Sequence, residues 1–359
     1  METNTANPLA TAPIPQQLRK YSIPTTLTLL VNYLYNIVDQ IFVGQGVGIT
    51  GMAATNVAFP LTIVTIAVAL MIGDGCAANL NLYLGRKDQE SADRIISQTA
   101  TLLLSAGVLL GLLGSLFARQ IVLLFGATST SFQAALAYTR VIILGLPFLM
   151  FSSALTAMIR ADGNPKFAMK AMMLGAAINL ILDPILIFGF HMGEVGAGIA
   201  TVIGEAASGI LCLSRLKCLQ TVHVRKKWLC PTPSVALQIF RLGFPSFLTQ
   251  IMTAVVQVTM NNLMKQYGAA MPFGSDVALS VYGALMKVYQ IAHAMFVGVS
   301  SATQPINSYN FGAKQFARVQ RTYKMASSIA LLVSVGWFAV YQGIPRVIGS
   351  LFVTGDTVY

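Results

Sequence analysis

Charged residues are scarce in this sequence, and their scarcity excludes an ordinary soluble domain. Only 10% of the 359 residues are Asp, Glu, Lys or Arg, whereas soluble domains carry about 25%. Hydrophobic residues make up 55% of the chain, and the mean hydropathy is +0.68. Apolar runs long enough to cross a bilayer as helices recur along its length. Because the runs are too long for barrel strands, we expect an all-α, polytopic membrane protein.

Cysteine and histidine are also few, which argues against a metal cluster. The four cysteines (Cys76, Cys212, Cys218 and Cys230) form no CxxC motif, and the three histidines are scattered. We interpret the cysteines as small apolar residues. Without clustered histidines, paired metal-binding acids or a nucleophile elbow, the sequence does not indicate a membrane-embedded enzyme, and we expect no cofactor.

Nine membrane spans are predicted, and the basic residues set their orientation. The spans cover 22–44, 53–82, 96–117, 135–158, 168–190, 196–216, 238–263, 278–305 and 323–343. Segment 1–18 does not resemble a cleaved signal peptide. Of the 23 Lys and Arg residues, 18 lie at the N-terminus or in the joints after even-numbered spans. The positive-inside rule places these segments in the cytoplasm.

The net charge of +11 is therefore interpreted as a topology signal. The basic run RKKW at 225–228 lies in one cytoplasmic joint, where it can also contact lipid headgroups. Its position predicts no nucleic-acid partner.

An internal repeat predicts two similar halves. Joint 83–87 (YLGRK) aligns with joint 309–314 (YNFGAK) when Gly85 is placed on Gly312, at an offset of 227, and RQIVLLFGAT (119–128) then falls on RVIGSLFVTG (346–355). At an offset of 221, Pro24 meets Pro245. With six spans per copy, both halves have the same orientation, a transporter design whose substrate site lies between the halves.

The repeat divides the chain into a six-helix lobe (1–218), a cytoplasmic linker (219–236) and a second lobe (237–359) of three spans. Tyr359 corresponds to about Phe132, so spans 4 to 6 have no counterparts in the second half. We expect about nine spans of a twelve-span design, lacking roughly 90 residues, and no transport by this chain alone.

Four acids fall within the spans: Asp39, Asp74, Asp183 and Glu205. Placing such an acid at the centre of a membrane-spanning helix costs about 2.5–3.5 kcal/mol, so each of the four is a candidate functional residue. Asp39 follows Asn32 and Asn36 at helical spacing, Asn179 lies four residues before Asp183, and Thr201 lies four before Glu205. Three spans thus present oxygen ligands, which suit Na⁺ or proton storage. Pro184 has no amide hydrogen, which leaves the Leu180 carbonyl free to accept.

Each of these acids also has a structural interpretation. Asp39 could contact headgroups, Asp183 could pair within the protein, Glu205 could hydrogen-bond to a neighbouring helix, and Asp74 could lie at the interface. Lys287 either pairs with an acid or extends to the membrane surface.

Four stretches resemble the MATE (multidrug and toxic compound extrusion) transporters. They are IPTTLTLLVNYLYNIVDQIFVGQGVG, GRKDQESADR, MIRADGNPKFAMKAMMLGAAINLILDPILIFG and GEVGAGIATVIGE. The resemblance implies twelve spans in two six-helix lobes and antiport of cationic amphipathic compounds against H⁺ or Na⁺. It places the cation site at Asp39, Asn179, Asp183 and Thr201, and a helix bend at Pro24.

The resemblance leaves the second lobe without its own cation site, because spans 7 and 8 carry no acid. The candidate cavity residues of the second lobe are Gln250, Gln257 and Lys287. Those of the first lobe are Asn32, Asn36 and Glu205. The expected partners are cationic drug-like molecules and the lipid bilayer, for a monomer in the cell membrane. The alternative function is a flippase or exporter of lipid-linked sugars; a channel is a further rival.

Overall fold

The computed structural model describes residues 7–125, 127, 132–268, 270–271 and 274–343. Helices dominate these ranges, and none of their residues is in a strand. The long helices are α2 (Ile14–Gly46), α3 (Ile49–Gly85), α4 (Gln89–Leu124), α5 (Phe132–Ala161), α6 (Pro165–Pro184), α7 (Gly193–Arg215), α8 (Pro233–Gly268), α9 (Gly274–Gly312) and α10 (Phe316–Gly343). Short elements are α1 (Pro8–Thr11), the π-helix η1 (Ile185–Gly189) and the 3₁₀-helices η2 (Leu216–Cys218) and η3 (Lys226–Trp228).

The predicted all-α membrane architecture is confirmed. Each predicted span lies in a long helix, and the fifth span combines α6 with η1. Within the described residues, eight helices are long and apolar enough to cross a membrane. The span 278–305 lies in α9, which is not among those eight. The helices are longer than the predicted spans. For example, α2 begins at Ile14, whereas the first span was predicted to begin at residue 22. Helical hydrogen bonding continues beyond the apolar run from which the span was predicted.

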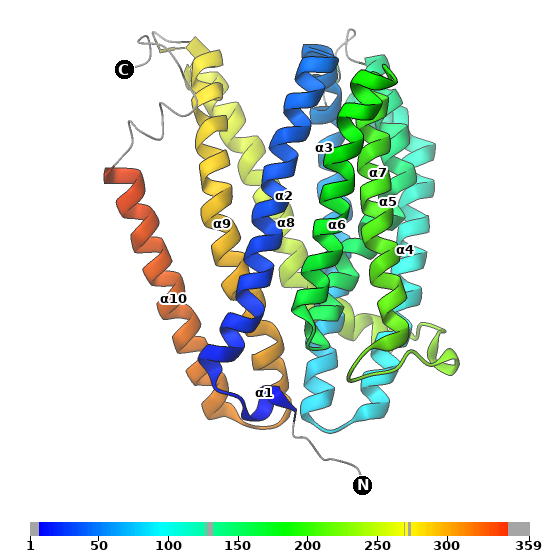
Figure 1. Cartoon of the computed structure of the whole chain (residues 1–359), viewed down its shortest axis with the longest axis vertical. Helices are drawn as coiled ribbons and strands as arrows, with labels where there is room; N and C mark the ends of the chain where they lie inside the picture. Colours follow the sequence, from blue (N-terminus) through cyan, green and yellow to red (C-terminus); the bar gives the residue numbers. More distant parts are fainter. Residues whose placement is uncertain (1–6, 126, 128–131, 269, 272–273, 344–359) are drawn as a thin grey trace.

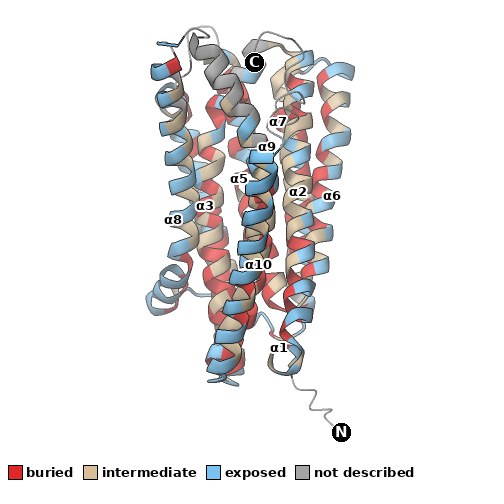
Figure 2. Cartoon of the chain, turned by 90° about the vertical axis from the view of Figure 1, so that its left-hand side faces the viewer, coloured by how far each residue is buried: buried red, intermediate tan, exposed pale blue. Residues whose placement is uncertain are grey.

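Burial divides the helices into an interior and an exterior set (Figure 2). The core cluster of α3, α4 and α5 contains large, fully buried side chains such as Ile72, Ile95 and Met158. In contrast, α10 has Thr322 and Ala326 as its buried residues and exposes Leu331 and Leu332. Exposed apolar side chains on a membrane-spanning helix face a solvent as apolar as themselves.

The helices α2 to α7 pack as one group, called here the first bundle, and α8 and α9 join it along α3 and α2 (Figure 1). Pro24 in α2 and Pro245 in α8 both lie inside their helices. The hydroxyl of Thr28 donates to the Pro24 carbonyl at 2.8 Å, and that of Thr249 donates to the Pro245 carbonyl at 2.8 Å. The repeat offset of 221 is thus accompanied by the same local hydrogen bond in both helices.

The contact between α3 and α9 also follows the repeat. A Cβ atom added to Gly85 would lie 2.1 Å from the Tyr309 carbonyl oxygen, and one added to Gly312 would lie 2.2 Å from that of Leu82. Leu82 and Tyr309 are separated by the same 227 residues as the two glycines. The contact is therefore reciprocal, as a two-fold axis between α3 and α9 requires. The repeat segment 346–355 lies outside the described residues.

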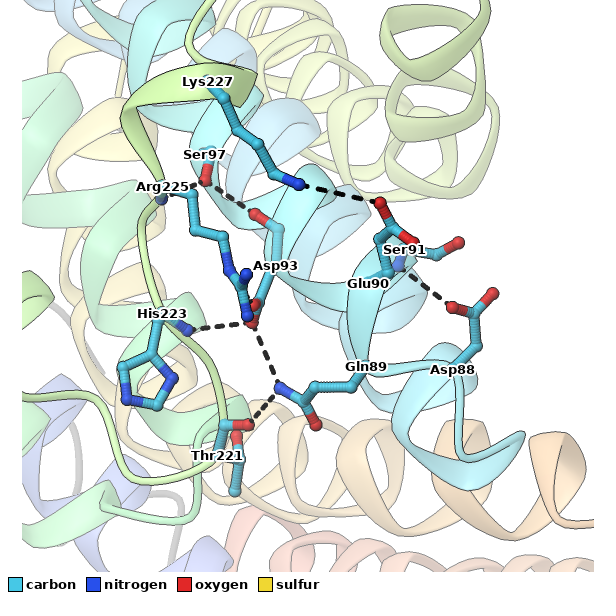
Figure 3. Close-up of polar contacts among 10 residues, drawn as sticks. All are labelled: Asp88, Gln89, Glu90, Ser91, Asp93, Ser97, Thr221, His223, Arg225 and Lys227. Carbon is cyan, nitrogen blue, oxygen red and sulfur yellow. Dashed lines mark hydrogen bonds and ion pairs between the residues drawn. The ribbon is translucent and has the colours of Figure 1, made fainter.

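The chain between α7 and α8 is docked on the first bundle (Figure 3). Asp93 of α4, whose side chain is 1% exposed, accepts from the His223 amide at 3.0 Å and from Arg225 Nε at 2.7 Å. The Asp162 carboxylate accepts from the Gln220 and Thr221 amides at 2.7 and 2.8 Å. Helix α8 begins at Pro233, inside the stretch 219–236 predicted as linker. These hydrogen bonds fix 220–225 of this stretch on the first bundle.

Replacing Asp93 by Ala is expected to loosen this docked segment. The substitution leaves the His223 amide and the Arg225 guanidinium without their acceptor, and a hydrogen bond to a charged group is worth about 1.5–3 kcal/mol. Trypsin should then cleave the solubilised protein faster after residues 225–227. Glu90→Ala is the control, because the Glu90–Lys227 pair, at 3.8 Å, has exposed side chains on both partners. Equal cleavage rates in the two variants would show that Asp93 does not hold the segment.

Candidate functional site

The acids and amides predicted for the cation site come together between α2, α6 and α7. Asp39 lies on α2, Asn179 and Asp183 lie on α6, and Thr201 lies on α7; these three helices are neighbours. Asp183 is fully buried, and Asn179 and Asp39 are 3% and 9% exposed. The structure therefore brings together side chains that are up to 162 residues apart in the sequence.

Hydrogen bonds link α6 to α7 within the site. The Asn179 side-chain nitrogen lies 3.4 Å from Asp183 Oδ1 and 3.3 Å from Thr201 Oγ1. The Thr201 hydroxyl donates to the Ala197 carbonyl at 3.0 Å. The carboxyl groups of Asp39 and Asp183 are close enough to interact electrostatically. Two carboxyl groups, an amide and a hydroxyl thus share one buried position.

Several oxygen atoms of this group have no partner. Asp39 Oδ1, Asn179 Oδ1 and Asp183 Oδ2 are buried and accept no hydrogen bond from a described residue. The ion pairs among the described side chains involve neither Asp39 nor Asp183. Buried oxygens normally have partners, and unpaired carboxylate and amide oxygens are what a proton or a hard cation would satisfy.

Two glycines allow the close approach of α6 and α7. A Cβ atom on Gly204 would lie 2.6 Å from the Gly175 carbonyl oxygen and 3.3 Å from the Asn179 Cβ. A Cβ atom on Gly175 would lie 2.8 Å from the Gly204 carbonyl oxygen. Small residues let helices in a membrane approach backbone to backbone, and this crossing brings Asn179 to Thr201.

The turn after Asp183 fixes the end of α6 against α2. Beyond Pro184 the helix continues as the π-helix η1, in which the Phe190 amide donates to the Ile185 carbonyl at 3.0 Å. Ile187 of η1 is buried, and its side chain fills the space beside Gly46 of α2. Single π-helical turns are frequent at functional sites.

Replacing Gly204 by Ala should separate α6 from α7 and disturb the site. Overpacking of this kind costs about 1–3 kcal/mol. We expect a lower thermal midpoint and weaker stabilisation by Na⁺ or by protons in the solubilised protein. Gly336→Ala on α10 is the control, since nothing lies within 4 Å of its added Cβ atom. If both variants behave alike, the α6–α7 crossing does not hold the site together.

A cavity of about 20 Å³ adjoins the cation site. Its lining includes Asn179 and Thr201 of the site and also Asn32, Tyr35 and Glu205. Tyr35 was not predicted as a site residue, although it lies four residues before Asp39. Tyr138 of α5 was also missed; it is buried and packs on Gly198 of α7. No sequence pattern singles Tyr138 out.

The remaining cavity candidates lie at different places. Asn36 is exposed and its amide donates to the Asn32 carbonyl at 2.7 Å, so it does not join Asn32 and Asp39 inside the site as the helical spacing predicted. Gln250 and Gln257 are half-buried and share a face of α8 with Ser246. The side chain of Lys287 lies outside the described residues.

Asp74 belongs to a separate polar cluster that joins α3 to three other helices. Its carboxylate accepts from the Ser246 hydroxyl of α8 at 2.8 Å and lies 3.9 Å from Arg160 of α5. The Gln304 amide of α9 donates to the Asp74 backbone carbonyl at 2.9 Å. These contacts hold α8 and α9 to the first bundle.

A bundle of long apolar helices that encloses buried acids and amides defines a multi-pass membrane protein. The family model described as MatE matches residues 24–185 and 245–359, and the chain belongs to this family.

Two similar proteins are staphylococcal. One is the multidrug export protein MepA of Staphylococcus aureus (strain N315), 26% identical over 352 residues that cover 97% of this chain and 75% of MepA. The other is MepA of Staphylococcus haemolyticus (strain JCSC1435), 28% identical over 319 residues, covering 88% and 68%. A solved structure of a multidrug resistance MATE family transporter in an outward-facing conformation matches with a TM-score of 0.90 at 23% identity. It covers 100% of this chain and 78% of the other, and at this identity it supports the fold alone.

Proposed function

We propose that this protein is an antiporter that exports cationic amphipathic compounds in exchange for H⁺ or Na⁺. The observation that carries the proposal is the buried group of Asp39, Asn179, Asp183 and Thr201, with unpaired oxygens and no described cationic side chain paired with its acids. Such a group can remain inside a membrane when it binds a cation or a proton. Membership of the MatE family supports the same function.

The proposed mechanism is alternating access. A cation or proton from outside binds at Asp39 and Asp183 and cancels one of their two negative charges, which weakens the repulsion between the carboxyl groups and allows α2 to move relative to α6. Pro24 supplies a point of bending in α2, because proline cannot donate the helical hydrogen bond. Coupling requires that the ion and the exported compound favour different states of the bundle.

The exported compound would bind between the first bundle and the helices α8 and α9. Gln250 and Gln257 on α8 are the proposed contacts there, since both are half-buried on the face that carries Ser246. The acids of the first bundle favour a cationic compound over an anionic one. We further propose a monomer in the cell membrane with its N-terminus in the cytoplasm, in two lobes related by the internal repeat.

Ethidium efflux tests the proposed function. In cells that lack their own drug pumps, expression of a twelve-span version of the protein should accelerate ethidium efflux, and dissipation of the ion gradients should abolish that gain. The alternative, a flippase for lipid-linked sugars, predicts rescue of a cell-wall precursor defect without any gain in efflux. Efflux that persists without ion gradients would contradict antiport.

A further inference from the structure

Glu205 lies one helical turn after Thr201 on α7, and its role is not explained by the four-residue site. Its side chain lines the same cavity as Asn179 and Thr201. A volume of about 20 Å³ is enough for one water molecule. Because Asn179, Thr201 and Glu205 all carry polar groups, the cavity also offers the two to four partners that a buried water needs. A water molecule there would connect Glu205 to the cation site.

The surroundings of Ser152 on α5 bear on the protonation state of Glu205. Ser152 is fully buried, and its hydroxyl oxygen lies within hydrogen-bonding distance of Glu205 Oε2 and 3.1 Å from the Leu149 carbonyl oxygen. A hydroxyl has one proton and can donate it to one of these acceptors. If Glu205 is protonated, it donates to Ser152, and Ser152 donates to Leu149, so that both bonds form. If Glu205 is ionised, Ser152 turns to it and the bond to Leu149 is lost.

No described cation neutralises Glu205. The ion pairs among the described side chains join other acids, and the titratable groups that face Glu205 cannot supply a positive charge. These groups are Tyr35 of α2 and Cys212 of α7. An unpaired carboxylate inside a membrane is costly. This cost favours a proton on Glu205.

We propose that Glu205 is a proton-binding group attached to the ion site: it holds a proton donated to Ser152 while the site is empty, and cavity water links it to Asn179 and Thr201. When Glu205 releases this proton to the water, its carboxylate accepts the Ser152 hydroxyl in exchange. The proposal rests on the proposed function for its role in transport, but the protonation of Glu205 is a property of the chain itself. It makes Glu205 a third acid whose charge changes alongside Asp39 and Asp183.

Infrared spectroscopy of the purified chain in lipid nanodiscs tests the protonation directly. A protonated carboxylic acid has a C=O stretching band that a carboxylate lacks. We expect Glu205→Gln to remove one such band from the wild-type spectrum at neutral pH in the absence of Na⁺. Ser152→Ala should shift the frequency of the same band, because the acid then loses its hydrogen-bond partner. Glu90→Gln, which removes an exposed acid by the same chemical change, should leave the band intact.

The outcomes separate this proposal from the antiport proposal. An unchanged band in Glu205→Gln would overturn the proton on Glu205, whatever Asp39 and Asp183 do in efflux assays. A band that Glu205→Gln removes but Ser152→Ala leaves at its wild-type frequency would overturn the bond to Ser152. For transport, Glu205→Gln imitates the protonated acid, so we expect efflux to persist with an altered pH profile. An unaltered profile would overturn the role of Glu205 at the ion site.

Discussion

In a twelve-span version of the protein, replacing Asp183 or Asp39 by Asn is expected to lower ion-driven efflux by about 5- to 150-fold, the factor that corresponds to typical coupling free energies of about 1–3 kcal/mol. Asparagine keeps the size of the side chain but carries neither a charge nor a titratable proton. Each variant site therefore keeps only one ionisable carboxyl group, and ion binding favours one conformation over the other less strongly. Asp183 should be the more sensitive, because it is fully buried and also lies 3.4 Å from Asn179.

Asp88→Asn is the matched control for this prediction. Asp88 caps α4 by accepting from the Ser91 amide at 3.0 Å, outside the membrane-spanning part of the helix. Hydrogen bonds from Ser91 lower its pKa, so that Asp88 is ionised at neutral pH. Asparagine caps helices equally well, and the substitution removes a charge without touching the site. Wild-type efflux in both Asp183→Asn and Asp39→Asn would exclude these acids as the coupling group.

Side chains added where α3 crosses α9 should lower the stability of the protein strongly. In Gly85→Leu or Gly312→Leu, the new Cβ atom would need to displace a backbone carbonyl, which has no rotamer to change. Overpacking costs about 1–3 kcal/mol in typical cores, and we expect at least this loss of stability here, with a lower thermal midpoint of the solubilised protein. Because the contact is reciprocal, the two variants should lose similar amounts.

Gly336→Leu on α10 provides the comparison for the crossing. Nothing lies within 4 Å of a Cβ atom at Gly336, and leucine has the higher helix propensity by about 1 kcal/mol. This variant should be as stable as the wild type or slightly more so. If Gly85→Leu unfolds at the same temperature as Gly336→Leu, α3 and α9 do not pack as closely as the structure indicates.

The sequence was informative about the helices and the four-residue site for identifiable reasons. Apolar runs predict the helices directly, because a helix that crosses the hydrocarbon core of a membrane needs a continuous run of apolar residues. Asn179 and Asp183 are four residues apart on one helix, so local periodicity places them together. Pairing them with Asp39 of α2 required the resemblance to a family, because no periodicity relates residues on separate helices.

Other features depend on contacts between distant segments and left no local pattern. In the sequence, Ser152 resembles a small residue that packs between helices. Its contact with Glu205 depends on how α5 is oriented against α7. Asn36 satisfies the helical spacing but is exposed, because the buried face of α2 is narrower than its polar stripe. Asp93 looks like a solvated acid near a helix start, yet it is buried by the segment that follows α7.

The most direct test of the central claim is transport into proteoliposomes with a Na⁺ gradient and a pH gradient imposed separately. In a twelve-span version of the protein, at least one gradient should drive ethidium against its own concentration difference, and Asp183→Asn should lower this accumulation while Asp88→Asn should not. Accumulation by the Asp183→Asn protein equal to that of the wild type under the same gradient would contradict the assignment of the buried acids as the coupling site.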